Sequence, residues 1–208
     1  EGSPCTNTSY GYTNRFITAP GENTTLEPVI YGTCEISGDG GSEGGWVLVW
    51  SDEFDSPNID MSKWSYDVGT GEWGWGNNEA QYYTSNSNNS FIENGHLVIQ
   101  ALLQNYGGAN YTSARMVTRY QGDWTYGKIE VRAKLPGGVG TWPAIWMLPT
   151  DWVYGGWPYS GEIDIMEHVG FDPNVIHGTA HTEVYNWWNG VPPPEGTIYI
   201  NSATSSFH

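Results

Sequence analysis

Hydrophobic and polar residues alternate over short stretches of this chain, and turn-forming residues separate these stretches. The clearest alternation runs over 127–135, where one face of a predicted strand carries Ile129, Val131, Ala133 and Leu135. Other apolar or alternating stretches predict strands at 46–54, 96–103, 113–119, 142–148, 162–169 and 175–185. A helical turn is indicated only at 59–64. This pattern predicts an all-β fold, an antiparallel β-sandwich.

The first 45 residues differ from the rest of the chain. They hold both cysteines and several turn signals, and they end in the Gly-rich run 38–45. Such a composition is typical of a flexible linker. We therefore expect an N-terminal extension with a Gly-rich linker over 1–45 and the main domain over 46–208.

The two cysteines, Cys5 and Cys34, both lie in this extension. A disulfide between them would close the loop-rich segment on itself, and it favours a secreted, extracellular protein. The alternative is two free thiols in a cytosolic protein.

Composition narrows the class of ligand. The 208 residues include 7 Lys and Arg against 23 Asp and Glu, which gives a formal net charge of −16. So few cations exclude a nucleic-acid-binding surface and disfavour an anionic membrane. The 28 Gly, 12 Trp and 14 Tyr instead favour a neutral, ring-shaped ligand. Carbohydrate fits best, because aromatic faces pack well against the apolar faces of sugar rings.

The predicted strand 162–169 carries the candidate chemistry. Glu162 and Asp164 share one face of this strand because side chains alternate with a period of two, but Glu167 has the opposite parity. A β-bulge near Ile165 and Met166 would return Glu167 to the face that carries the other two acids. The bulge would leave the Cα atoms of Glu162 and Glu167 about 13 Å apart.

Three clustered carboxylates disfavour full ionisation, so we expect at least one to stay protonated near neutral pH. A protonated acid beside an ionised one is the pair that glycosidic cleavage requires, and the spacing permits the retaining geometry. One alternative is an exposed acidic strand face. Another is a metal site with His168, His177 or His181 as further ligands.

The motif Glu162-Ile-Asp-Ile-Met-Glu167 resembles the bulged signature of glycoside hydrolase family 16. Further segments resemble its laminarinase branch in order: Trp50-Ser-Asp-Glu-Phe54, Gly74-Trp-Gly-Asn-Asn-Glu-Ala-Gln-Tyr-Tyr-Thr84, Ser113-Ala-Arg115, Gly127-Lys-Ile-Glu-Val-Arg132, Trp142-Pro-Ala-Ile-Trp-Met-Leu148 and Gly178-Thr-Ala-His-Thr182. The resemblance covers residues 46–208. It implies a jelly roll with a concave substrate cleft, and endo-hydrolysis of β-1,3-glucans with retention of configuration.

The resemblance also implies roles for individual residues. Glu162 would be the nucleophile, Glu167 the general acid/base, and Asp164 a hydrogen-bond partner of the nucleophile. The substrate-binding residues would be Asn78, Arg115, Trp142, Trp146 and His181. Of these, the tryptophans would be sugar platforms, and His181 would lie near the acid/base.

These roles have structural alternatives. The two tryptophans would otherwise be core residues, Arg115 would form an ion pair with an acid, and His181 would be a structural histidine. The resemblance implies no cofactor for catalysis but a structural Ca²⁺, with backbone oxygens near Glu53 and Gly95 as ligands.

Two other functions remain open. One is a mixed-linkage β-1,3(1,4)-glucanase or another polysaccharidase of the same family. The other is a non-catalytic β-glucan recognition protein on the same fold, although both predicted catalytic glutamates are present here.

The last residues of the sequence prompt an expectation about completeness. The pair Phe207-His208 resembles the start of a further strand in related proteins, where several more strands follow. We expect a C-terminal continuation, a nicked second chain or a partner subunit to supply these strands.

Overall fold

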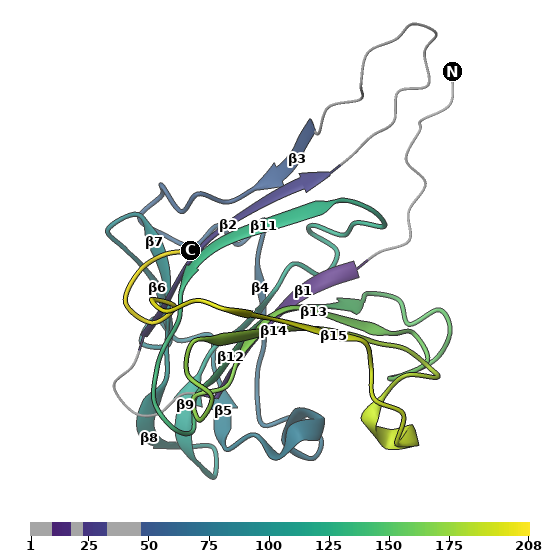
Figure 1. Ribbon diagram of the computed structural model, residues 1–208. Helices are drawn as coiled ribbons and strands as arrows, with labels where there is room; N and C mark the ends of the chain where they lie inside the picture. The colour runs from purple at the N-terminus through teal and green to yellow at the C-terminus, as the bar shows by residue number, and fades with distance from the viewer. Residues whose placement is uncertain (1–9, 18–22, 33–46) are drawn as a thin grey trace, which may run out of the picture.

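Two large β-sheets pack face to face and a small sheet adjoins them in the computed structural model, which describes residues 10–17, 23–32 and 47–208 (Figure 1). The seven-stranded sheet runs in the order β15 (Glu195–Tyr199), β14 (Val175–His181), β13 (Glu162–His168), β12 (Trp142–Pro149), β1 (Tyr10–Ile17), β10 (Arg115–Val117) and β4 (Ser65–Asp67). Every pairing in this sheet is antiparallel. This architecture confirms the predicted all-β jelly roll.

The second large sheet packs against the core face of the first. It runs β11 (Lys128–Lys134), β2 (Asn23–Gly32), β7 (His96–Gln100) and β6 (Ser90–Glu93), and β3 (Val47–Ser51) also pairs with β2. The small sheet runs β5 (Gln81–Tyr83), β9 (Ala109–Ser113) and β8 (Leu102–Tyr106), and β5 pairs with β9 in parallel. Two short helical turns complete the elements: the π-turn η1 (Gly74–Asn78) and the 3₁₀ turn η2 (Trp187–Asn189).

The core lies between the two large sheets and contains side chains from both. From the seven-stranded sheet come Met116, Ile145, Met147, Met166 and Ile176; from the other sheet and its flanking loop come Leu97, Ile99, Ala133 and Leu135. Ile129 and Val131 pack against the same cluster. The alternating face predicted over 127–135 is therefore the buried face of β11, as hydrophobic alternation requires for a half-buried strand.

The N-terminal segment takes part in both sheets. The strand β1 lies between β12 and β10, and β2 lies between β11 and β7. The pattern of hydrophobic and polar residues predicts neither strand. The predicted boundary between residues 45 and 46 stays a prediction, and Cys5, Cys34 and the Gly-rich run lie outside the described residues.

The core face of the seven-stranded sheet is incompletely covered near its β15 edge. Residues paired across antiparallel strands share a face, so Ile198 lies on the core side with Ile176, and Ile163 with Met147. Yet Ile198 is 61% exposed and Ile163 45% exposed, whereas Ile176 and Met147 are buried. An apolar strip on this side of the sheet thus faces solvent.

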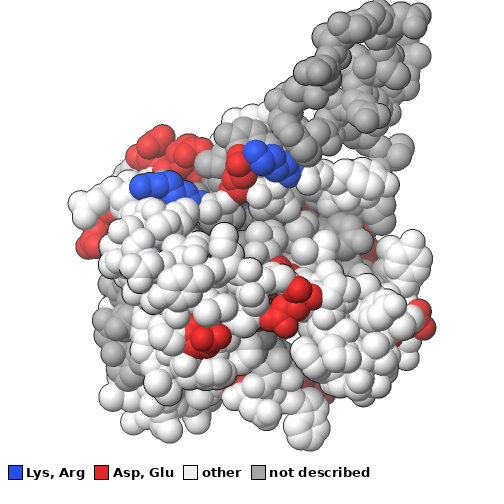
Figure 2. Space-filling view, viewed as in Figure 1, with Lys and Arg blue, Asp and Glu red and all other residues white. Residues whose placement is uncertain are grey.

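The distribution of charge follows the composition. In Figure 2 most of the visible surface is uncharged, acidic groups are scattered, and the basic groups gather at the top, where β11 lies in Figure 1. That strand carries Lys128, Arg132 and Lys134. No helix among the described residues is long and apolar enough to cross a membrane.

Candidate active site

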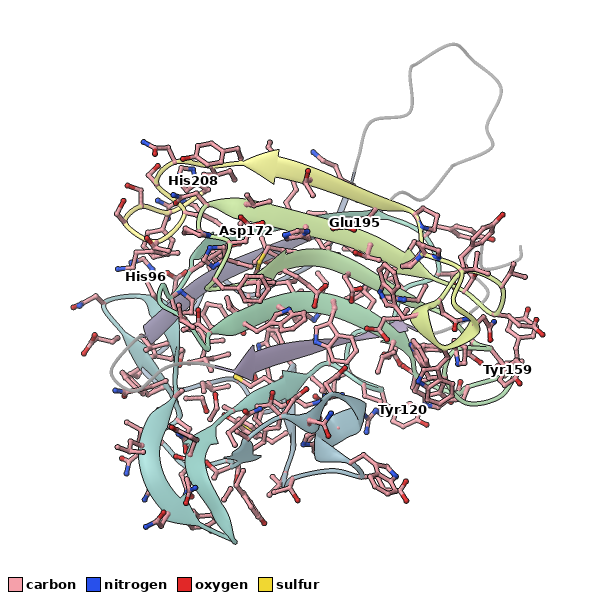
Figure 3. All side chains as sticks on the ribbon, turned by 60° about the horizontal axis from the view of Figure 1, so that its bottom comes forward. His96, Tyr120, Tyr159, Asp172, Glu195 and His208 are labelled. Atoms are coloured by element: carbon pink, nitrogen blue, oxygen red, sulfur yellow. The ribbon has the colours of Figure 1, made fainter. Side chains whose placement is uncertain are left out.

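The three acids of β13 lie on the face of the seven-stranded sheet that points away from the core, here called the acid face. Figure 3 views this sheet from that side, with β15 at the top and β12 and β1 below. Asp164 is buried, with 5% of its surface exposed, while Glu162 and Glu167 are half-buried. On the opposite face, Met166 belongs to the core.

A β-bulge brings the acids together, as the parity of Glu167 predicted. On the β12 side, Trp146 pairs with Asp164 and Ile145 with Met166, so Ile165 is the extra residue. On the β14 side, Asp164 pairs with Thr179 and Glu167 with His177. Two residues of β13 therefore oppose one of each neighbour, which is the definition of a bulge. Glu167 consequently shares a face with Asp164.

The β14 register places a histidine across from each glutamate. His181 pairs with Glu162 and His177 pairs with Glu167. The resemblance implies His181 beside Glu167, but the register places it across from Glu162, the predicted nucleophile. The reason is that the two glutamates lie near opposite ends of β13, so each pairs with a different end of β14.

His181 contacts the central acid. Its Nε2 lies 3.1 Å from Oδ2 of Asp164, and both side chains are at least nine-tenths buried. Donor atoms of Glu162, Asp164 and His181 all lie within 4.8 Å of one another. Two carboxylates and one imidazole are also a ligand set that a divalent cation accepts. This is the metal alternative weighed from the sequence, although with His181 alone of the three histidines.

The other two histidines have different surroundings. His168 is fully buried, and its Nε2 accepts the backbone N–H of Asn174 at 3.2 Å. It lies on the core side of β13, away from the acids. His177 lies on the acid face, and its Nδ1 is 2.5 Å from a carboxylate oxygen of Glu195.

Trp142 contacts the predicted acid/base directly. Its indole Nε1 donates to Oε1 of Glu167 at 2.8 Å. The ring is half-buried, so part of its surface stays open on the acid face. Trp142 is thus not a simple core residue, and its role as a sugar platform stays a prediction.

Trp146 and Arg115 are packed against each other. The guanidinium carbon of Arg115 lies 4.9 Å from the ring centre of Trp146 and 4.4 Å from that of Trp75. Arg115 is only 4% exposed and Trp146 only 5%. Little of either side chain is therefore open to a ligand in this structure.

Asp67 holds Arg115 in this position. Arg115 Nε donates to Oδ2 of Asp67 at 3.1 Å, and the more exposed Arg119 also donates to this carboxylate. The ion pair is the alternative that the sequence left open for Arg115. The sugar-binding role of Arg115 stays a prediction.

The remaining predicted site residues lie elsewhere. Asn78 is exposed at the end of η1, with a positive φ of 55°. Glu53 is exposed after β3, and Gly95 lies in the turn between β6 and β7. No interaction that the structure describes joins Glu53 to Gly95, so the calcium site stays a prediction.

Sequence reasoning missed several contributors: Asp67, Trp75, Trp157 and Glu195. Two of them carried a local signal: Trp157 lies five residues before Glu162 in a turn-rich segment, and Trp75 lies in the segment 74–84 that resembles the family. Asp67 and Glu195 contact the site through pairings between distant strands. For His177 the sequence predicts only a possible role as a metal ligand.

Comparison with known proteins agrees with the site. A family profile described as "XgeA-like, catalytic GH16 domain" matches residues 77–192, and the chain therefore belongs to glycoside hydrolase family 16. The matched segment includes the whole bulged strand.

Individual relatives are similar over most of the chain. A beta-glucanase of Rhodothermus marinus is 54% identical over 167 residues, covering 78% of this chain and 57% of the relative. A glucan endo-1,3-beta-glucosidase of Cryptopygus antarcticus is 48% identical over 165 residues, covering 76% and 57%. The chain spans less than two thirds of the length of both relatives.

The fold comparison agrees. The crystal structure of the laminarinase from Rhodothermus marinus aligns with a TM-score of 0.75 and 53% sequence identity. The alignment covers 79% of this chain and 66% of that structure.

Proposed function

We propose that this protein is an endo-hydrolase that cleaves β-1,3-glucosidic bonds in laminarin-type glucans and retains the anomeric configuration. The observation that carries the proposal is the bulged strand, which places Glu162, Asp164 and Glu167 on one sheet face. The similarity to a beta-glucanase and a glucan endo-1,3-beta-glucosidase supports the choice of substrate.

In this proposal each glutamate has its own step. Glu167 gives its proton to the glycosidic oxygen while Glu162 attacks the anomeric carbon, forming a glycosyl–enzyme ester. Glu167 then removes a proton from water, which displaces Glu162 and releases the sugar with its configuration retained. The N–H of Trp142 stabilises the carboxylate of Glu167 formed after the first transfer.

Asp164 and His181 support the nucleophile. Their contact at 3.1 Å keeps a polar, hydrogen-bonding partner within reach of the Glu162 carboxylate. A neighbour of this kind fixes the orientation of Glu162 and influences its protonation.

The test is a product profile on laminarin, barley β-glucan, lichenan and agarose, with Glu162→Gln as the inactive control. We expect a ladder of oligosaccharides from laminarin and no products from the control. Faster cleavage of barley β-glucan or lichenan would favour the mixed-linkage alternative. Glucan binding without products would favour a recognition protein.

We further propose that the protein is secreted and that Cys5 and Cys34 form a disulfide. The only support for both is that the chain has two cysteines and that both lie in the N-terminal segment. Mass spectrometry of a non-reduced digest would show a peptide joining the two cysteines.

We propose a structural Ca²⁺ as well. A melting temperature that falls with EDTA and returns with calcium would support it, and an unchanged one would contradict it.

The exposed apolar strip supports one more proposal: additional β-strands, from a further segment or a complementary chain, cover Ile163 and Ile198. Isoleucines this exposed on the core side of a sheet lose the free energy that burial would supply. Replacing both by Thr should leave the stability of an uncovered domain nearly unchanged. A covered domain should lose several degrees in melting temperature.

A further inference from the structure

Two exposed tryptophans, Trp187 and Trp188, lie near the end of the acid face that carries Glu162. Trp187 and Trp188 form the turn η2, in the loop 182–194 that follows β14 and precedes β15. Trp188 is 77% exposed and Trp187 is 60% exposed. Large exposed aromatic surfaces are uncommon on soluble proteins without a binding role.

The loop holds these side chains in a fixed arrangement. Asn186 at its centre is fully buried, and its amide donates to the carbonyls of Thr182 and Glu183 at 3.0 Å each. Its amide oxygen accepts the backbone N–H of Asn189, and Asn189 in turn donates to Glu183. A loop with this many internal hydrogen bonds presents its tryptophans with little conformational entropy left to lose on binding.

A chain of ring contacts joins Trp188 to the acids. Trp188 packs perpendicular to Trp157, with ring centres 4.9 Å apart. Trp157 lies 5.9 Å from the ring of His181, and His181 contacts Asp164. The tryptophan pair is therefore continuous with the candidate active site. In Figure 3 the coil of η2 lies at the same end of the sheet as Tyr159, which is also exposed.

The perpendicular packing leaves most of the Trp188 surface open. An indole held in this way offers a flat apolar face, and its N–H can donate to a hydroxyl. A β-linked glucosyl unit presents the complementary surface, with axial C–H groups on the ring face and hydroxyls at the rim. The strongly acidic chain makes an anionic partner unfavourable at this position.

We propose that Trp188, supported by Trp157 and flanked by Trp187, stacks on a glucosyl unit of the bound β-glucan beyond the units at the scissile bond. The inference rests on the proposed function, since it takes the same glucan as its ligand. The pair is thus an additional aromatic subsite, built by the loop between β14 and β15.

The test compares Trp188→Ala with Tyr126→Ala, which removes a similarly exposed aromatic (81%) beside the other sheet. Both are made in the Glu167→Gln background, so that binding of laminarihexaose is measured by calorimetry without hydrolysis. We expect Trp188→Ala to weaken binding about tenfold and Tyr126→Ala to leave it unchanged. Trp188→Phe should lose less than Trp188→Ala, and it gives the same comparison if the alanine variant does not fold.

Equal affinities for the parent and Trp188→Ala would overturn the inference while leaving the proposed function intact. A parent that binds no laminarihexaose, in an enzyme that also leaves laminarin uncleaved, would instead refute the proposed function. A third result also overturns the inference: Trp188→Ala turns a dimer into a monomer in sedimentation, with unchanged glucan affinity. The pair would then be a contact between copies of the chain.

Discussion

The indole N–H of Trp142 donates a 2.8 Å hydrogen bond to the carboxylate of Glu167. This contact joins the first residue of β12 to the penultimate residue of β13. Trp142, which we expect to be a sugar platform, is therefore also a hydrogen-bond donor to the predicted acid/base. A hydrogen bond to a charged group contributes roughly 1.5–3 kcal/mol, so its loss should be visible in kinetics.

We predict that Trp142→Phe lowers kcat on laminarin about tenfold with little change in KM, because the ring remains but the donor is lost. Trp142→Ala should lower kcat similarly and also raise KM. Steady-state kinetics of the two variants separate the tasks. Equal kcat values for Trp142→Phe and the parent would show that the hydrogen bond contributes nothing to the reaction.

The bulge in β13 gives a second prediction. Deleting Met166 leaves Glu162, Asp164 and Glu167 in strict alternation, with Ile165 able to take the core position of Met166. Inserting an alanine after Asp164 also restores parity without a bulge, but it places Glu167 about 6.6 Å farther from Asp164 along the strand. We expect the deletion variant to keep measurable laminarin hydrolysis and the insertion variant to lose it.

Circular dichroism establishes whether both strand variants fold. The account of the bulge would be wrong if the folded deletion variant were as inactive as Glu167→Gln, or if the folded insertion variant were active.

Arg115 and Arg119 both donate to Asp67, so the stability contributions of a buried and an exposed ion pair can be compared. The side chain of Arg115 is 5% exposed and that of Arg119 is 44% exposed. Asp67→Asn leaves the buried guanidinium without its counter-charge, which should destabilise the fold by about 3 kcal/mol. Arg119→Ala should cost less than about 1 kcal/mol, as exposed ion pairs do.

Urea unfolding measures both free energies. Similar losses for Asp67→Asn and Arg119→Ala would contradict the buried pairing of Arg115 with Asp67.

His168 predicts a dependence of stability on pH. Burial lowers the pKa of this imidazole below its ordinary value. Below pH about 6.5 the unfolded chain binds a proton that the folded chain does not, so stability falls as pH drops toward the lowered folded pKa. Stability from this group is complete above pH about 6.5.

His168→Gln keeps an acceptor for the Asn174 N–H but does not titrate. We expect the fall in melting temperature between pH 7 and pH 5 to be smaller in this variant than in the parent. An identical fall in both would show that His168 does not contribute to acid sensitivity.

Much of the site could be predicted because its signal is local. The parity of Glu167 against Glu162 and Asp164 required a bulge, and the structure places it at Ile165. The alternation over 127–135 likewise identified the buried face of β11. In both cases period-two alternation within one strand was sufficient.

The parts that escaped prediction depend on pairings between distant segments. The contact of His177 with Glu195 spans 18 residues and exists only because β14 and β15 are in register. Arg115 meets Asp67 across 48 residues. The strand β2 contains Pro28 and has little alternation, so its position between β11 and β7 is visible only in three dimensions.

Chemical rescue tests the central claim most directly, namely that Glu162 is the nucleophile and Glu167 the acid/base of a retaining reaction. Glu167→Ala is supplied with azide and an aryl β-laminaribioside, whose leaving group needs no proton, and the product is analysed by NMR. The account predicts restored turnover and a β-glycosyl azide, with an α-glycosyl azide from Glu162→Ala as the control. An α-glycosyl azide from Glu167→Ala, or rescue that yields the β product from Glu162→Ala, would contradict it.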